Sequence, residues 1–272
     1  MSRTPPLAVV LVETAGALNV GSVARVCANF GVSDLRLVAP RCDHLSEEAL
    51  RMAVHASGVL ERAALFPSLT AALADCGRVV ATSGRCSGEP LPLQDMDTAL
   101  RWLRQEAPPA ALRSPATSSA RALVFGREDR GLSNAELLQA GRVLTIDTAT
   151  AYSSLNLAQA AAVVLHHWHS LQDNRPQGDR QRPGAPPQQP DPCPRGVLEA
   201  MLGDAEHLLL AVGFLHPHTA AARMAKLRAL LQRAQVSTAE TALLRGMVRQ
   251  LRWASTRGRT GTRAGDDPDR TP

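Results

Sequence analysis

Short apolar runs alternate along the first two thirds of the chain with longer segments whose apolar residues recur every three or four positions. The runs lie at residues 7–12, 35–38, 79–82, 122–125 and 143–146. Runs of this length with little polar alternation are typical of strands covered on both faces. The longer segments lie at residues 19–31, 46–66, 68–73, 97–105, 134–140 and 157–171. They predict helices, so the alternation indicates an α/β fold with a mostly parallel sheet.

The segment at residues 19–31 begins with Asn19 and ends with Gly31, which we expect to be the N-cap and the C-terminal stop of a helix. Its apolar stripe comprises Val20, Val23, Cys27 and Phe30. Arg25 lies off the centre of that stripe, because successive residues turn by about 100°. Arg25 can therefore face a cleft.

Residues 152–157 read Tyr-Ser-Ser-Leu-Asn-Leu and join the apolar run at 143–146 to the helix predicted at 157–171. Ser153, Ser154 or Asn156 can cap that helix by accepting a hydrogen bond from a free first-turn N–H group. The same junction lies at the carboxyl end of a strand, where ligands bind in open α/β folds. Capping and ligand binding both remain open at this point.

The composition changes after residue 172 and divides the chain. Residues 1–172 form the α/β domain, and residues 173–195 form a linker, because prolines crowd its second half. Helical periodicity returns in residues 196–254, with segments at 197–212, 219–234 and 237–253, the last opened by a capping box at 237–240. Residues 255–272 have little to anchor them, so we expect a disordered tail.

The chain of 272 residues carries a net charge of +5, which favours a polyanionic partner. The basic residues of the helical extension are Arg223, Lys226, Arg228, Arg233, Arg245, Arg249 and Arg252. Five scattered cysteines without a CxxC pair indicate reduced thiols in a cytoplasmic protein. No apolar run is long enough to span a membrane. His166 and His169 share a helix face but have no third ligand, so we expect no metal.

Three loops carry polar residues after predicted strands, at residues 82–84, 126–128 and 152–157, and the first two also contain glycine. Glycine lets a backbone approach a ligand closely, and exposed backbone groups can bind a base edge. The chain has no GxGxxG after its first strand and no GxxxxGK[ST]. A nucleotide-like ligand is therefore more consistent with these loops than a dinucleotide or a P-loop triphosphate.

These loops carry a resemblance to the SPOUT class of RNA methyltransferases. Asn19 with Arg25 resembles motif 1, residues 123–137 resemble motif 2, and residues 152–158 resemble motif 3. Together they are similar to the TrmH family, which methylates ribose 2′-hydroxyls, and to its TrmJ-like subgroup, which acts on nucleotide 32 of the tRNA anticodon loop. Residues 214–217 and 227–251 resemble that subgroup's C-terminal extension. The loop before Asn19 departs from the subgroup, with Ala17-Leu18 in place of Pro-Gly.

The resemblance implies a SPOUT α/β-knot, in which a trefoil-knotted parallel sheet binds S-adenosyl-L-methionine, and a homodimer that acts on tRNA with C, U or both at position 32. The cofactor contacts that it implies are Thr82, Ser83, Gly84, Gly126, Ile146, Ser153, Ser154 and Leu155. It also implies that Arg25 is catalytic and that Asn19, Glu128 and Asn156 are the other polar motif residues.

A guanidinium is a poor base at neutral pH, so we expect Arg25 to lower the pKa of the 2′-hydroxyl and to hold the developing alkoxide. Glu128 can orient Arg25 or cap the loop, and Asn156 can serve only the helix start. Two alternative functions remain: the same reaction on ribosomal RNA, and a non-catalytic RNA-binding module. Binding of S-adenosyl-L-methionine without RNA distinguishes the enzymes from the non-catalytic module.

Overall fold

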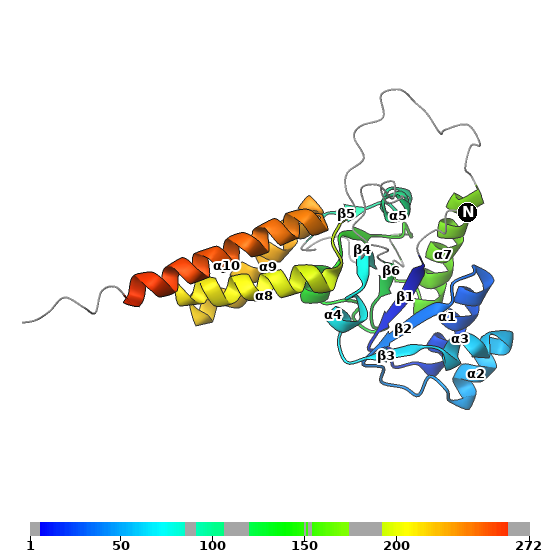
Figure 1. Ribbon diagram of the computed structural model, residues 1–272. Helices are drawn as coiled ribbons and strands as arrows, with labels where there is room; N and C mark the ends of the chain where they lie inside the picture. The colour runs from blue at the N-terminus through cyan, green and yellow to red at the C-terminus, as the bar shows by residue number, and fades with distance from the viewer. Residues whose placement is uncertain are drawn as a thin grey trace, which may run out of the picture.

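The computed structural model describes residues 6–84, 91–105, 120–149, 151, 154–173 and 192–260. Its centre is a seven-stranded sheet with the order β3-β2-β1-β6-β4-β7-β5. Every neighbouring pair of strands is parallel, as the apolar runs predict (Figure 1). The strands are β1 (Leu7–Val12), β2 (Asp34–Val38), β3 (Ala64–Phe66), β4 (Cys76–Thr82), β5 (Leu93–Gln94), β6 (Ala120–Phe125) and β7 (Arg142–Leu144).

Helices cover both faces of the sheet. The helices of this domain are α1 (Ala17–Asn29), α2 (Glu47–Ala53), η1 (Val54–Ala56), α3 (Ser57–Glu61), α4 (Leu69–Ala72), α5 (Met96–Arg104), α6 (Asn134–Leu137) and α7 (Leu157–Asp173). In β1, Leu7, Val9 and Leu11 pack into the core that contains α1, α5 and α7, whereas alternate residues pack into the core that contains α4 and α6. Burial of the whole strand confirms the prediction of a sheet covered on both faces.

The sequence prediction was wrong at two short strands. Residues 64–66 form β3 at the sheet edge rather than the end of a helix, and the helical stretch before it is broken into α2, η1 and α3. Val54 interrupts that stretch with a φ of 55°. The strand β5 has only two residues and was not predicted.

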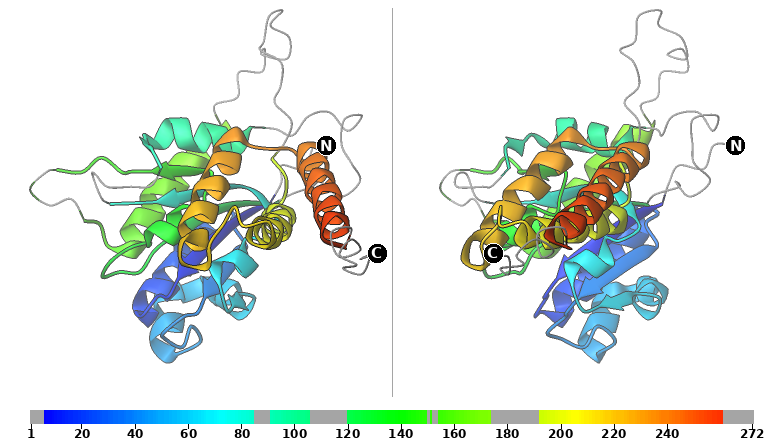
Figure 2. Two further views of the ribbon diagram at one scale, coloured as in Figure 1. Left: turned by 90° about the vertical axis from the view of Figure 1, so that its left-hand side faces the viewer. Right: turned by 60° about the vertical axis from the view of Figure 1, so that its left-hand side comes forward.

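Three helices form an arm that extends from one side of the sheet domain (Figures 1 and 2). They are α8 (Arg195–Ala211), α9 (Pro217–Ala234) and α10 (Thr238–Thr260), and they share a core of their own. The predicted capping box is present, because the Glu240 carboxylate accepts hydrogen bonds from Ser237 while the Ser237 hydroxyl accepts one from the Glu240 N–H group.

The boundaries predicted for the linker and the tail need correction. Pro192 pairs with Ser237 in an isolated bridge and Arg195 begins α8, so residues 192–195 belong to the arm. At the other end, α10 continues to Thr260, so residues 255–260 are helical rather than disordered. The rest of the predicted linker between residues 174 and 191, and the tail at 261–272, lie outside the described residues.

The knot remains a prediction, because the loops that would form its crossing include residues 85–90, 150, 152 and 153, which lie outside the described part. No described helix is both long enough and apolar enough to cross a membrane. Within the same residues, no group of three or more His, Cys, Asp or Glu side chains could hold a metal ion.

Candidate active site

A cavity of about 380 Å³ lies at the carboxyl ends of β4, β6 and β7. It is lined by Thr82, Ser83, Gly84, Phe125, Gly126, Arg127, Glu128, Asp129, Arg130, Gly131, Leu132, Ile146, Ser154, Leu155, Leu157 and Ala160. Every residue expected to contact a cofactor is among them except Ser153, which lies outside the described residues. The structure thus gathers three distant segments around one space of the size that small-molecule ligands occupy.

Backbone hydrogen bonds fix the strand ends that open into this cavity. The Ser83 N–H group donates to the Leu144 carbonyl at 3.0 Å, which ties the end of β4 to the end of β7. The Thr82 hydroxyl donates to the Val124 carbonyl at 3.2 Å, which ties β4 to β6. Ile146 follows β7 rather than lying inside a strand, as the apolar run at 143–146 had suggested.

Gly126 is required by the turn that follows β6. A Cβ atom at this position would lie 2.3 Å from the Gly131 carbonyl carbon and 2.5 Å from the Leu132 nitrogen. The chain doubles back so tightly because Arg127 and Gly131 exchange two backbone hydrogen bonds, and Gly131 has a φ of 67°. Close packing of backbone on backbone thus explains this glycine, beside the ligand contact that we predicted for it.

A chain of hydrogen bonds joins the three motif loops. The Asn19 amide donates to the Glu128 carboxylate at 3.1 Å, and the Asn156 amide donates to the Asn19 side-chain oxygen at 2.9 Å. The same carboxylate accepts hydrogen bonds from the N–H groups of Ala15 and Gly16. The predicted polar motif residues other than Arg25 therefore form one connected unit that reaches the cavity through Glu128.

The Glu128 carboxylate is held in its ionised form. Burial by itself raises the pKa of this carboxyl, but hydrogen bonds from Asn19, Ala15 and Gly16 outweigh burial, so its pKa lies below the ordinary value. Its position before the first turn of α1 also places negative charge at the positive end of a helix dipole. Of the two roles considered for Glu128, the observed contacts are those of a loop cap, and no ion pair with Arg25 occurs among the described residues.

Asn19 is not the N-cap of α1. The helix begins at Ala17 with Gly16 as its N-cap, so Asn19 lies in the first turn and its side chain is free to bridge Glu128 and Asn156. Asn156 does perform a capping role, because its side-chain oxygen accepts a hydrogen bond from the Ala158 N–H group at 2.9 Å. Asn156 therefore both caps the start of α7 and binds the Asn19 side chain.

Arg25 lies on the exposed side of α1, two turns beyond the residues that contact Glu128. It does not line the cavity, and it makes no hydrogen bond or ion pair within the described part of the chain. Its guanidinium is therefore exposed and has no partner among the described residues.

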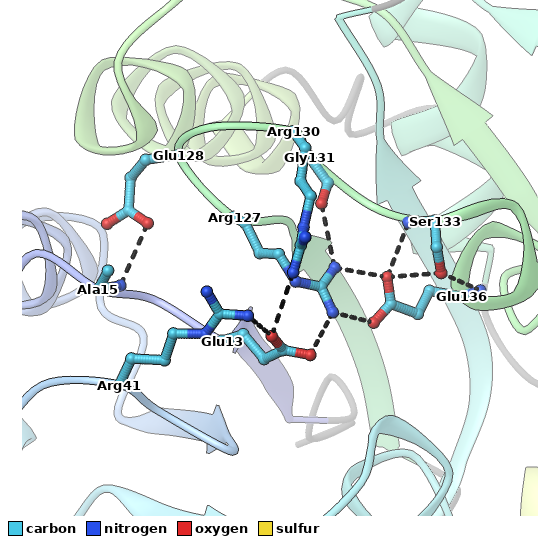
Figure 3. Close-up of polar contacts among 9 residues, drawn as sticks. All are labelled: Glu13, Ala15, Arg41, Arg127, Glu128, Arg130, Gly131, Ser133 and Glu136. Atoms are coloured by element: carbon cyan, nitrogen blue, oxygen red, sulfur yellow. Dashed lines mark hydrogen bonds and ion pairs between the residues drawn. The ribbon is translucent and has the colours of Figure 1, made fainter.

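An ion-pair network beside the cavity was not predicted (Figure 3). Arg127 donates to both carboxylate oxygens of Glu136, at 2.8 and 2.9 Å, and to the Glu13 carboxylate. Glu13 also pairs with Arg41 and, at 3.7 Å, with Arg130. Glu136 completes a capping box with Ser133 at the start of α6. The network thus connects the loop after β1 to the loop that lines the cavity.

The charges of this network are stabilised by one another. Hydrogen bonds from Arg127 and then Arg41 lower the pKa of Glu13 to about 2. Hydrogen bonds to Glu136 and Glu13 raise the pKa of Arg127 above its ordinary value. Burial opposes the ionisation of Glu136, but Arg127 and Ser133 outweigh it and lower the pKa of that carboxyl. All three groups are ionised over the physiological pH range.

The family that matches the sheet domain identifies the class of enzyme. The SpoU rRNA Methylase family matches residues 6–166, and the C-terminal domain of the tRNA methyltransferase TrmJ matches residues 195–262. The chain belongs to the SpoU rRNA methylase family. It is therefore a methyltransferase, which confirms the class predicted from the three motifs.

Curated relatives of this SpoU-family chain match most of its length. A tRNA (cytidine/uridine-2′-O-)-methyltransferase TrmJ from Cronobacter sakazakii is 37% identical over 246 residues, which cover 88% of this chain and 93% of that protein. The TrmJ of Escherichia coli strain K12 is 35% identical over 88% of this chain and 92% of its own length. The predicted resemblance to the TrmJ subgroup is thereby confirmed.

Solved structures agree with this assignment. The crystal structure of TrmJ from Z. mobilis ZM4 superposes with a TM-score of 0.73 and 31% identity, covering 90% of this chain and 98% of that one. A probable methylase family protein from Haemophilus influenzae Rd KW20 superposes with a TM-score of 0.56 and 26% identity, covering 92% and 97% of the two chains. The predicted sheet with a helical C-terminal extension is confirmed.

Proposed function

We propose that this SpoU-family protein methylates the 2′-hydroxyl of a ribose in tRNA, with S-adenosyl-L-methionine as the methyl donor. The observation that carries the proposal is the match of both the sheet domain and the helical arm to proteins named tRNA (cytidine/uridine-2′-O-)-methyltransferases. The family description refers to ribosomal RNA, but the arm matches a domain described for a tRNA enzyme. The arm therefore favours tRNA over ribosomal RNA.

The cavity has the chemistry that the cofactor requires. Its wall combines apolar side chains, among them Phe125, Leu132 and Ile146, with the backbone of the glycine-containing loops at 82–84 and 126–131. Such a mixture suits an adenine ring and a methionine chain that must be oriented by few polar groups. Thr82, Ser83, Gly84, Gly126, Ile146, Ser153, Ser154 and Leu155 would hold the cofactor, which supplies an electrophilic methyl group.

The chain's own residues orient and activate the ribose. The Arg25 guanidinium, free of partners among the described residues, donates hydrogen bonds to the 2′-hydroxyl oxygen as negative charge develops on it. This lowers the pKa of the hydroxyl, and the proton leaves to solvent or to an RNA phosphate. Asn19 and Asn156 act less directly, because they fix the start of α1 against Glu128 at the cavity rim.

The arm supplies the electrostatic contact with RNA in this proposal. Two of its basic residues are already neutralised, since Arg228 pairs with Glu199 and Arg245 pairs with Asp204. Arg249 and Arg252 on α10 are exposed and remain suited to phosphate contacts. If both contact phosphates, replacing them with Gln reduces the magnitude of the slope of log affinity against log salt by about 1.4–1.8. Arg51→Gln on α2 is the control, because it removes charge outside the arm and leaves the slope unchanged.

Nucleotide 32 with C, U or both is the proposed position within tRNA, and it rests on the motif resemblance. Mapping ribose methylation on total tRNA from cells with and without the gene tests it. Loss of one 2′-O-methyl group at position 32 supports the proposal, whereas loss at a ribosomal RNA position with unchanged tRNA overturns it.

A homodimer is part of the same proposal. The helices α1 and α7 pack side by side and leave Leu18 and Val163 exposed on their surfaces. Apolar residues exposed on adjoining helices are suited to contact between subunits. Light scattering of the purified protein tests this directly, and a monomer at micromolar concentration contradicts it.

A further inference from the structure

Two exposed aromatic side chains lie on the arm. Phe214, in the turn between α8 and α9, is 62% exposed, and Trp253 on α10 is 51% exposed. All other Phe and Trp residues of the chain are buried or half-buried, and these are Phe30, Phe66, Trp102, Phe125 and Trp168. Packing in a core therefore does not explain why the two positions on the arm are aromatic.

Each exposed ring has an arginine beside it. The Arg223 guanidinium carbon lies 5.9 Å from the centre of the Phe214 ring, and Arg223 donates a hydrogen bond to the Phe214 carbonyl at 2.9 Å. Arg249 precedes Trp253 by four residues on α10, so the two side chains leave the same side of the helix. An aromatic face beside a guanidinium is suited to a nucleic-acid base, which stacks on the ring while the positive charge attracts the phosphate backbone.

The turn that carries Phe214 has a fixed backbone. Gly213 ends α8 with a φ of 78°, which glycine adopts without strain. On the other side, Leu215 is 2% exposed, packs in the core of the arm, and donates its N–H group to the Leu209 carbonyl at 3.0 Å. Phe214 thus lies between two anchored residues with its ring in solvent, so little conformational entropy is lost when a ligand stacks on it.

The surface around the two rings is basic. The chain has no Asp or Glu between Glu206 and Glu240, and none from there to residue 260. Glu240 is engaged by Ser237 in the capping box, and Glu199 and Asp204 of α8 pair with arginines. An RNA strand combines the negative charge and the flat apolar bases that fit such a surface.

The α8–α9 turn and the second half of α10 lie toward the free end of the arm (Figure 1). The helix α8 has 17 residues and spans about 25 Å, and neither ring lines the cavity of the sheet domain. In paired RNA the bases stack on one another, so only unpaired bases offer their faces to a side chain. We propose that Phe214 and Trp253 each stack on an unpaired base of tRNA. The inference rests on the proposed function, which takes tRNA as the substrate.

Binding of a tRNA transcript to the full-length protein tests this role. Phe214→Leu and Trp253→Leu keep an apolar side chain but remove the ring, and each should weaken tRNA binding by roughly tenfold. The slope of log affinity against log salt should stay the same, because no charge is removed. Phe214→Tyr and Trp253→Phe should keep most of the affinity. The kcat at saturating tRNA should be unchanged in all four variants.

Leu251→Ala is the matched control, because Leu251 is an apolar residue of α10 that is 58% exposed and is not aromatic. It should bind tRNA like the unaltered protein. A long RNA duplex separates stacking from other contacts, since nearly all of its bases are paired. Phe214→Leu and Trp253→Leu should bind the duplex normally but should lose affinity for a single-stranded oligouridylate, as for tRNA.

Two results overturn the proposal while leaving the proposed function intact. One is tRNA binding by the two leucine variants that equals that of the Leu251→Ala control, which would assign the rings to a protein partner instead. The other is an equal loss of affinity for tRNA and for the duplex, which would exclude stacking. If the unaltered protein binds no tRNA, the proposed function fails together with this inference.

Discussion

Arg127 offers the sharpest test of how the cavity is supported. Its side chain is 8% exposed and donates to Glu136 at 2.8 and 2.9 Å, to Glu13, and to the Gly131 carbonyl at 3.2 Å. Arg127→Met keeps a chain of similar length but leaves two partly buried carboxylates without their principal partner. Breaking a fully buried pair costs about 3–5 kcal/mol, and an exposed pair about 0–1 kcal/mol. We expect a loss of about 2–4 kcal/mol in unfolding free energy.

The same change should weaken cofactor binding more than it slows the reaction. Residues 126–132 line the cavity, and the Arg127 contacts with Gly131 and Glu13 hold that loop against the end of β1. If about 1.4 kcal/mol of the lost free energy is needed to re-form the loop on binding, the KM for S-adenosyl-L-methionine rises about tenfold. The kcat should change less, because Arg127 does not contact the proposed catalytic Arg25.

Urea unfolding and steady-state kinetics with saturating tRNA measure the two effects. Arg130→Met is the matched control, because Arg130 also pairs with Glu13 but at 3.7 Å and with a side chain that is 59% exposed. It should cost less than about 1 kcal/mol. The reasoning is refuted if Arg127→Met is as stable as the Arg130→Met control, or if kcat falls while KM for the cofactor is unchanged.

Three further outcomes follow from the site. The pKa of Glu13 is about 2 in the folded protein and about 4.3 in an unfolded chain, so its stabilising contribution is complete above pH 4.3 and is lost towards pH 2. In Glu13→Gln, the unfolding free energy measured by circular dichroism should therefore fall less steeply between about pH 4.3 and pH 2 than in the unaltered protein. Gly126→Ala should destabilise the protein by more than about 2 kcal/mol. Gly84→Ala, where a Cβ meets no atom of the described residues within 4 Å, should leave stability unchanged in urea unfolding. Arg25→Ala should lower kcat by a factor of about 100 or more without changing cofactor affinity measured by calorimetry.

The central strands of the sheet were predictable because each is an apolar run in the local sequence. Every residue of β1 and β6 is buried, and all of them except Arg121 are apolar, so each strand gives an apolar run that can be recognised without its neighbours. The edge strands lack that signal. Leu65 in the middle of β3 is 57% exposed, and β5 has two residues that are strand only through pairing with β7. Pairing of this kind depends on residues distant in sequence.

The ion-pair network was not predictable for a similar reason. Glu13 and Arg127 are 114 positions apart, and isolated charged residues after a strand are normally solvated. The sequence predicted only a helix at residues 134–140 in this region, and that prediction gave Arg127 no partner, although Glu136 lies in the helix. The motif resemblance identified the residues of the cavity wall without identifying the charges that hold that wall in place.

Asn19 was correctly predicted as a motif residue, but its predicted role as the N-cap of α1 was wrong. An asparagine before an apolar helical stripe normally caps the helix, because a local side chain must serve the free N–H groups. Here the Glu128 carboxylate, 112 positions from Gly16 along the chain, accepts hydrogen bonds from the Ala15 and Gly16 N–H groups, which precede the first turn, and no side chain caps the helix among the described residues. The N-cap lies three residues earlier than predicted, at Gly16 rather than Asn19, and the Asn19 side chain joins Glu128 to Asn156. A carboxylate from another loop thus fixes the segment before α1, and the start of this helix connects all three motifs.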